Sequence, residues 1–314
     1  MPVHAVWFLA AYTCSGFAGL VYEVTWTRLL TLYLGHTTAA ASVVVGAFLL
    51  GLAAGAAVTG RLARGLTRRT AIRTYALLEL GVAAVAVVLP AALVALTPLL
   101  RWAYADAAPG LAFPLVRVGL AVTLVLVPAL ALGATFPLAI RWFASDSPAR
   151  TRRAAMLYAT NTLGAAAGAL LAGFVLIPRL GVTRAILCGV AASVISAAIA
   201  FVAGRGTVET EAEPTVEPAR TRDPRASKVS RDRLAAAVDA APRRLWLAAS
   251  VLGLSGFAAL LHEIAWTRIL ALSIGPTTYA FAAALAAVIA GSAAGSWIGA
   301  WLVGRVRQPA LWLA

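Results

Sequence analysis

One stretch of this chain occurs twice. Residues 15–55 read SGFAGLVYEVTWTRLLTLYLGHTTAAASVVVGAFLLGLAAG, and residues 255–295 read SGFAALLHEIAWTRILALSIGPTTYAFAAALAAVIAGSAAG. The two stretches align without gaps at a shift of 240 residues, and twenty of the 41 positions are identical. Shared apolar composition does not explain this match, because Glu, Trp and Arg recur at fixed spacing. The second part of the chain therefore begins as a repeat of the first.

Both copies lie within long apolar runs. The chain is 61% hydrophobic and 12% charged, and its mean hydropathy is +0.87. A helix needs about 20 apolar residues to cross the ~30 Å hydrocarbon layer, and these runs are too long for barrel strands. We therefore predict an all-α integral membrane protein. The expected spans are 5–34, 37–60, 72–100, 117–143, 154–178, 182–203, 245–272 and 277–304.

The basic residues lie mainly in alternate loops. Arginines gather in segments 61–73, 141–153 and 305–307, whereas the intervening loops hold only one or two. Arginine-rich loops remain on the cytoplasmic side, so we expect a multi-pass protein of the cell inner or plasma membrane with a cytoplasmic N-terminus. The formal net charge of +14 would suggest nucleic acid in a soluble protein, but here the arginines lie mainly in short loops between apolar runs. The expected partner is thus the lipid bilayer and not nucleic acid.

Residues 204–244 interrupt the apolar pattern. They are rich in charged residues and proline and carry little apolar mass, which predicts a disordered cytoplasmic linker with a possible short helix at 230–240. The linker separates a first six-helix half, 1–203, from the start of a second half, 245–314, with two spans. Two six-span halves in the same orientation are typical of major facilitator transporters. We predict a major-facilitator-like bundle, truncated at Ala314 relative to that architecture.

Two motifs resemble a known family. The segment from Ser15 to Arg28, its second copy, and Tyr158-Ala-Thr-Asn161-Thr-Leu-Gly164 resemble the membrane region of spermidine synthase-like proteins. That family joins a major-facilitator-like region to a soluble aminopropyltransferase domain. The resemblance implies an aminopropyltransferase domain encoded downstream and polyamines as ligands. Segment 60–69 also resembles the facilitator loop between spans two and three, with Arg64 where that loop normally has Asp.

Aminopropyl transfer needs a Gly-rich nucleotide pocket and a cluster of carboxylates to hold the amine and remove its proton. Outside the linker the acidic residues are Glu23, Glu79, Asp106, Asp146 and Glu263. No Gly-rich loop follows a plausible soluble strand. We therefore assign this chain no catalytic residue and no cofactor, and whether it takes part in an enzyme stays open. Its three histidines lack metal-ligand spacing, so no metal site is expected.

Four polar residues within the spans are candidate substrate-binding groups, because ionisable groups there are costly and often functional. Glu23 and its repeat Glu263 would recognise a cation or would cap a bend near the outer boundary. In the second case Trp26 would lie in the aromatic belt of the membrane and Arg28 would extend to water. Trp266 and Arg268 repeat this structural motif in the second copy. Glu79 would accept a hydrogen bond from a neighbouring helix or would titrate with a cation. Asn161 would join two helices or contact substrate.

Three functions fit these observations. The chain would be the membrane region of a spermidine synthase-like protein that anchors and serves polyamine biosynthesis or transport. It would otherwise be a stand-alone facilitator of polyamines or other organic cations, or a truncated module without activity. The glycine ladders Gly51–Gly55, Gly164–Gly168 and Gly291–Gly295–Gly299 are interpreted as helix-packing surfaces.

Overall fold

The computed structural model describes residues 3–34, 38–104, 112–144, 150–205, 275 and 278–303, with 246–247, 250–251, 253–259, 261–262 and 264–273 between them. The chain divides into two compact units, Met1–Thr207 with Thr267–Ala314, and Val208–Trp266. Among the described residues, every regular element is a helix. The predicted linker lies outside them, apart from Gly204 and Arg205, which belong to the preceding helix.

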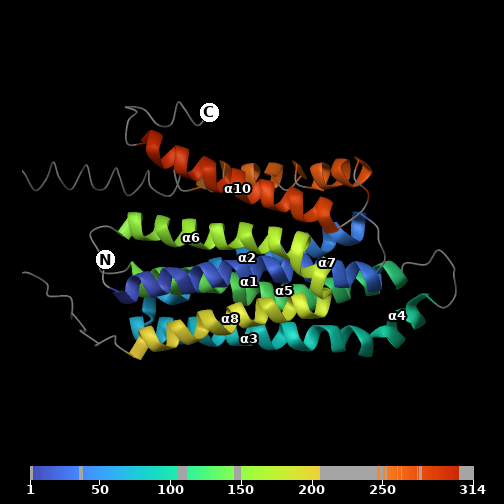
Figure 1. The fold of residues 1–314 in the computed structure, drawn as a ribbon, viewed down its shortest axis with the longest axis horizontal. Coiled ribbons are helices and arrows are strands. Elements are labelled where there is room, and N and C mark those ends of the chain that lie inside the picture. The colour runs from blue at the N-terminus through green and yellow to red at the C-terminus, as the bar shows by residue number, and fades with distance from the viewer. Residues whose placement is uncertain are drawn as a thin grey trace, which may run out of the picture. The chain divides into compact units, whose positions relative to one another are not determined.

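Long helices lie side by side in the first unit (Figure 1). The helices are α1 (Val3–Leu34), α2 (Thr38–Leu62), α3 (Arg68–Ala95), the short α4 (Thr97–Tyr104), α5 (Ala112–Phe143), α6 (Arg150–Leu171), the short α7 (Ile177–Leu180), α8 (Val182–Arg205) and α10 (Thr278–Val303), with short turns η1 (Ala63–Gly65) and η2 (Ala172–Leu176). For the first six spans and for α10, the helix ends agree with the predicted spans to within a few residues, because the lengths of the apolar runs set them. The third span bends at Leu96, where α3 gives way to α4.

The fifth span is not one regular helix. After α6 the backbone widens into the π-helical turn η2 and then continues as α7. Pro178 lies in α7, and its missing N–H is compatible with such an irregularity. Gly181 follows with a φ of 81°, a left-handed conformation that suits glycine, and the chain turns there into α8.

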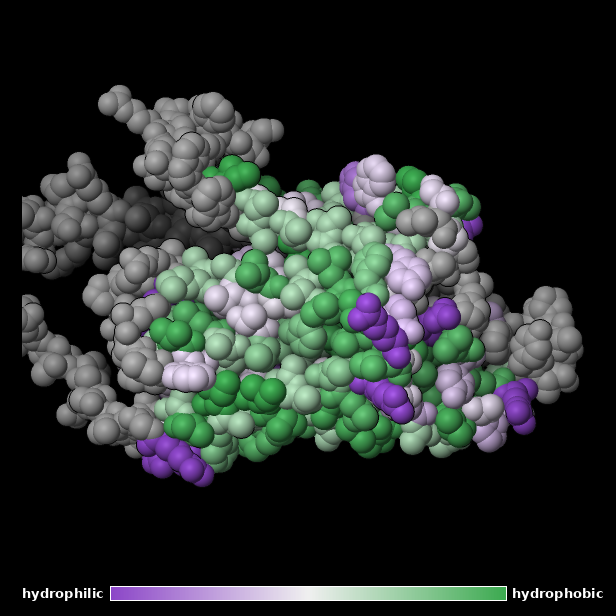
Figure 2. Space-filling view, viewed as in Figure 1, coloured by the Kyte–Doolittle hydropathy of each residue, from purple (hydrophilic) through white to green (hydrophobic). Residues whose placement is uncertain are grey.

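Six helical segments are long and apolar enough to span a membrane: Ala5–Tyr33, Ser42–Gly65, Arg68–Ala95, Pro114–Phe143, Arg153–Leu180 and Val182–Arg205. Large apolar side chains such as Leu77, Val88 and Leu163 are exposed on them. Apolar residues also cover most of the face shown in Figure 2. Such a surface suits hydrocarbon rather than water. The chain is therefore a multi-pass helical membrane protein.

The six spans pack in a regular pattern. The main pairs are α2 with α5, α1 with α6, α1 with α8, α3 with α8, and α3 with α5. If α1 corresponds to α5, α2 to α6 and α3 to α8, each contact of one set has a counterpart in the other. The α2–α5 contact corresponds to the α6–α1 contact, and the α3–α5 contact corresponds to the α8–α1 contact. The α3–α8 pair maps onto itself. The first three spans and the last three are thus packed equivalently.

Glycines bring the two equivalent pairs close together. A Cβ built on Gly55 of α2 would lie 2.0 Å from the Leu130 carbonyl oxygen of α5, and one built on Gly164 of α6 would lie 2.0 Å from the Thr13 carbonyl oxygen of α1. Only glycine allows backbones to approach this closely. The packing roles predicted for the ladders that contain Gly55 and Gly164 are confirmed.

The third predicted ladder behaves differently. A Cβ built on Gly291 or Gly295 would meet nothing within 4 Å among the described residues. The packing role predicted for these two glycines therefore stays a prediction. Helix α10 nevertheless begins 240 residues after α2 begins, as the repeat predicts. Its Leu285 and Ala286 pack against an apolar cluster from α1, α6 and η2.

Candidate functional site

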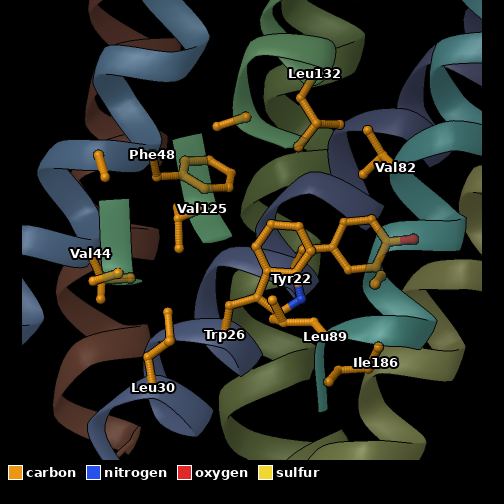
Figure 3. Close-up of a cluster of buried hydrophobic side chains, with 14 of the residues drawn as sticks. Tyr22, Trp26, Leu30, Val44, Phe48, Val82, Leu89, Val125, Leu132 and Ile186 are labelled. Atoms are coloured by element: carbon orange, nitrogen blue, oxygen red, sulfur yellow. The ribbon is translucent and has the colours of Figure 1, made fainter. Parts of the chain in front are cut away.

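A buried layer of polar side chains crosses three helices of the first unit. On one side lies an aromatic-rich apolar cluster that includes Phe8, Tyr12, Ile72, Tyr75, Trp142, Ala197 and Ala200. On the other side lies a second apolar cluster that includes Ala18, Tyr22, Trp26, Val82, Ala86, Leu89, Ile186 and Ala192 (Figure 3). Between the two clusters, α1 contributes Ser15, α3 contributes Glu79, and α8 contributes Ser193 and Ser196. We call these four residues the polar layer.

Glu79 is the centre of the polar layer. Its side chain is fully buried, with 0% exposure, about three turns after the start of α3. The Ser15 hydroxyl donates a hydrogen bond to Glu79 Oε1 and so joins α1 to α3. The hydroxyls of Ser193 and Tyr75 face the same carboxyl group. Glu79 Oε2, however, has no partner in hydrogen-bonding geometry.

Further hydroxyls extend this arrangement. The Tyr75 hydroxyl is 2.7 Å from Ser196 Oγ, which joins α3 to α8. The Tyr22 hydroxyl donates to Ser193 Oγ over 3.3 Å, which joins α1 to α8. All of these side chains are buried, so each hydroxyl needs a partner inside the protein. The polar layer therefore fixes the relative positions of three spans.

Among the residues that the structure describes, none brings a positive charge to Glu79. The groups that act on its carboxyl are the hydroxyls of Ser15, Ser193 and Tyr75, and none of them is basic. An isolated carboxylate in an apolar interior is costly unless a counter-charge or a proton neutralises it. The charge balance alone therefore allows either a neutral carboxylic acid or a carboxylate with a small bound cation. It leaves open both alternatives considered for Glu79, helix packing and cation binding.

Glu23 lies elsewhere on α1. Its side chain is also buried, with 4% exposure, and it follows Ser15 by eight residues, or about 12 Å along a helix. The two acids predicted from the first half are thus not brought together in one site. Glu263, the repeat of Glu23, lies outside the described residues. The pairing of Glu23 with Glu263 stays a prediction.

The tryptophans of the two repeats have different surroundings. Trp26 is fully buried and stacks on Tyr22, with ring centroids 5.2 Å apart, and its edge meets Phe48. Neighbouring helices enclose the ring of Trp26, so it does not face lipid, and its depth in the membrane stays a prediction. Trp266 is 56% exposed. Arg28 is half-buried and Arg268 is exposed.

Asn161 joins two helices. Its Nδ2 donates a hydrogen bond to the Tyr12 carbonyl oxygen over 3.2 Å, from α6 to α1. A Cβ built on Gly16 would lie 2.1 Å from the Asn161 carbonyl oxygen, so the two backbones touch here. These contacts agree with the helix-packing alternative for Asn161. They do not place this side chain against Glu79.

The serines and tyrosines of the site were not predicted. A signal was present for two of them, because Ser193 and Ser196 are spaced by three residues within an otherwise apolar span and so share a helix face. The three tyrosines, Tyr12, Tyr22 and Tyr75, gave no such signal, since aromatic residues are ordinary components of a core. Within the described part of the chain, no group of three His, Cys, Asp or Glu residues could hold a metal ion.

The fold and the polar layer together define a class: a multi-pass helical membrane protein that encloses an acidic group within its first six spans. The chain matches no protein-family model, no curated protein and no solved structure. The resemblance to spermidine synthase-like proteins therefore rests on the motifs around Glu23 and Asn161 alone.

Proposed function

We propose that this chain is a major-facilitator-type membrane region that recognises polyamines or related organic cations and serves a spermidine synthase-like protein. The observation that carries the facilitator part is the equivalence of the two three-helix sets. Facilitator halves are built from two inverted three-helix repeats, and the packing pairs exchange as such repeats require. The close glycine contacts support the same assignment. They occur between α2 and α5 and also between α1 and α6, the two helix pairs that correspond to each other in the repeats.

The cation part of the proposal is supported by charge. Glu23 and Glu79 are buried in the first unit, and Glu263 repeats Glu23. In a facilitator arrangement, the first and seventh spans both line the central cavity, so Glu23 and Glu263 would approach it from opposite sides. Two acids beside one cavity attract a cationic substrate, and polyamines carry several positive charges at neutral pH.

Uptake by reconstituted protein tests this proposal. We expect proteoliposomes that contain the full chain to accumulate labelled spermidine. We also expect Glu23→Gln and Glu263→Gln each to reduce uptake at least about tenfold, a difference of about 1.4 kcal/mol. Glutamine keeps much of the hydrogen bonding of glutamate but removes the charge. Glu209→Gln, a change in the predicted linker, is the matched control and should leave uptake unchanged.

Unchanged spermidine binding and uptake in the Glu23→Gln/Glu263→Gln double variant would leave these acids a structural role only. Reading the gene beyond the codon for Ala314 separates the two facilitator functions. An in-frame Gly-rich soluble domain favours service to an aminopropyltransferase, whereas further spans and a stop codon favour a stand-alone facilitator of organic cations.

A further inference from the structure

We infer that Glu79 is a proton-binding site of the membrane bundle, which takes up and releases a proton between α1, α3 and α8. The inference rests on the burial of this carboxyl, on its neighbours and on the two apolar clusters around it. It does not depend on polyamine recognition, which was assigned to Glu23 and Glu263. Proton binding would be a property of the chain in addition to polyamine recognition. A carboxyl that exchanges a proton inside a helical bundle can couple proton movement to helix movement.

The first step is the charge balance around Glu79. The titratable groups on or near it are Tyr75 on α3 and Tyr12, Cys14 and Tyr22 on α1, and neither a phenol nor a thiol can carry a positive charge. On α8 the titratable Cys188 lies about 140° around the helix from Ser193 and about 7.5 Å along its axis, and its thiol carries no positive charge. On α5 the neighbouring group is the Thr135 hydroxyl, which faces Tyr12 and does not titrate. Within the described residues, a proton is thus the simplest source of neutrality.

The second step is the hydrogen-bond balance. Oε1 accepts from Ser15, whereas Oε2 has no partner. An ionised carboxylate can only accept, but a protonated one carries an O–H donor. A proton on Oε2 would let Glu79 donate to the Ser193 or Tyr75 hydroxyl, because both face the carboxyl and each has a free lone pair. The same hydroxyls can donate to an ionised Oε2 or accept from a protonated one, so the site can satisfy the carboxyl in both protonation states, as proton exchange requires.

The third step separates a proton from a metal cation. A hard metal ion takes about six oxygen ligands around an open centre. Here the hydroxyls that would have to turn toward such an ion bond to one another, Tyr75 with Ser196 and Tyr22 with Ser193. Ser15 already contacts Glu79 directly. A proton needs only a lone pair and no cavity, so it fits this closed arrangement and a metal ion does not.

The fourth step is the route of exchange. Apolar clusters close the polar layer on both sides, with Tyr75 and Trp142 in one and Trp26 and Leu89 in the other. Water reaches the carboxyl only when α1 or α8 separates from α3. Hydration then stabilises the charged form, so separation of the helices favours release and repacking favours uptake. Proton exchange is thereby linked to rearrangement of the bundle.

Infrared difference spectroscopy of the full chain in liposomes tests the inference. We expect the carbonyl band of a protonated carboxylic acid at low pH, and we expect it to be lost as the pH rises. Glu79→Gln should remove this band, whereas Glu23→Gln, the matched change at the other buried acid, should retain it. Ser15→Ala keeps the carboxyl but removes its hydrogen-bond donor, so it should shift the band. This second variant keeps the test valid if Glu79→Gln does not fold.

Three results would overturn the inference. A titrating band that survives in folded Glu79→Gln would belong to another acid. A band that is present, or absent, at every pH would show that Glu79 exchanges no proton. Loss of the band on addition of Na⁺ at constant pH would identify a metal-cation site instead. If the band titrates as expected but spermidine uptake fails, the proton site stands and the polyamine proposal falls.

Discussion

Glycine has different roles at two positions of α2. Gly55 lies against α5, where a Cβ would come within 2.0 Å of the Leu130 carbonyl oxygen and within 3.0 Å of the Ala134 nitrogen. Both atoms belong to backbone, which cannot turn aside as a flexible side chain does. Gly46 lies on an exposed part of the same helix, and a Cβ there would meet nothing within 4 Å. Alanine substitutions at these two positions therefore distinguish the effect of close helix packing, at Gly55, from the low helix propensity of glycine, at Gly46.

We expect Gly55→Ala to lower the free energy of unfolding by about 1–3 kcal/mol, the usual cost of forcing extra volume into a packed contact. Gly46→Ala should leave the stability unchanged or raise it by up to about 1 kcal/mol, because alanine is the better helix former. Thermal unfolding of both purified variants in the same detergent measures the difference. Equal midpoints for the two variants would show that the α2–α5 contact is not as close as described.

At the scale of elements, two arginines connect the α2–α3 loop to the end of α5. Arg68 donates from Nε and Nη2 to the Trp142 carbonyl oxygen, over 3.1 and 2.8 Å. Arg141 donates in the opposite direction, from Nε to the Leu66 carbonyl oxygen over 2.8 Å. The last carbonyls of a helix lack partners within the helix, and cations near them are favourable. The loop that resembles the facilitator loop is thus fixed by Arg68 and Arg141, while Arg64 is exposed.

We expect Arg68→Gln and Arg141→Gln each to destabilise the protein by about 1.5–3 kcal/mol, the usual range for hydrogen bonds made by a charged group. Arg69→Gln, an exposed neighbour, should change stability by no more than about 0.5 kcal/mol. Limited trypsin digestion reports on the loop itself, and cleavage after Arg61 or Arg64 should become faster in the two destabilised variants. Digestion at the rate of the unchanged protein would mean that these bonds do not hold the loop.

At the scale of the whole molecule, the arrangement of arginines predicts how the chain crosses the membrane. The rich segments 61–73 and 141–153 lie at the same end of the six-span bundle, after an even number of spans. From the positive-inside rule we expect that end, the N-terminus and the 204–244 linker to lie in the cytoplasm. Six spans before the linker return the chain to the side on which it began.

Single-cysteine labelling measures this topology. In a background with Cys14→Ser and Cys188→Ser, the Arg222→Cys variant should react with a membrane-impermeant thiol reagent only after the cells are permeabilised. Cysteine introduced in the loop between the third and fourth spans, at Pro109, should react from outside and serves as the matched control. Labelling of Arg222→Cys in intact cells would reverse the predicted orientation.

The sequence by itself determined the membrane class, the span ends and the repeat. A helix needs about 20 consecutive apolar residues to cross the hydrocarbon layer of a membrane. Such a run can be recognised in the sequence without knowledge of tertiary contacts. The predicted start of the second span at residue 37 therefore differs by one residue from the start of α2 at Thr38. The repeat similarly predicted where α10 begins. Candidate acids such as Glu79 were also recognisable, because charges are rare in such runs.

Only the tertiary structure decided which side chains meet. Ser15, Glu79 and Ser193 lie far apart in the sequence and meet because α1, α3 and α8 place them at one level between two apolar clusters. Trp26 proved to be buried, and Gly291 proved to pack against nothing described. The physical reason is that lipid tails are as apolar as a protein core. A membrane helix is therefore apolar on every side, and its sequence does not reveal which face meets lipid and which meets another helix.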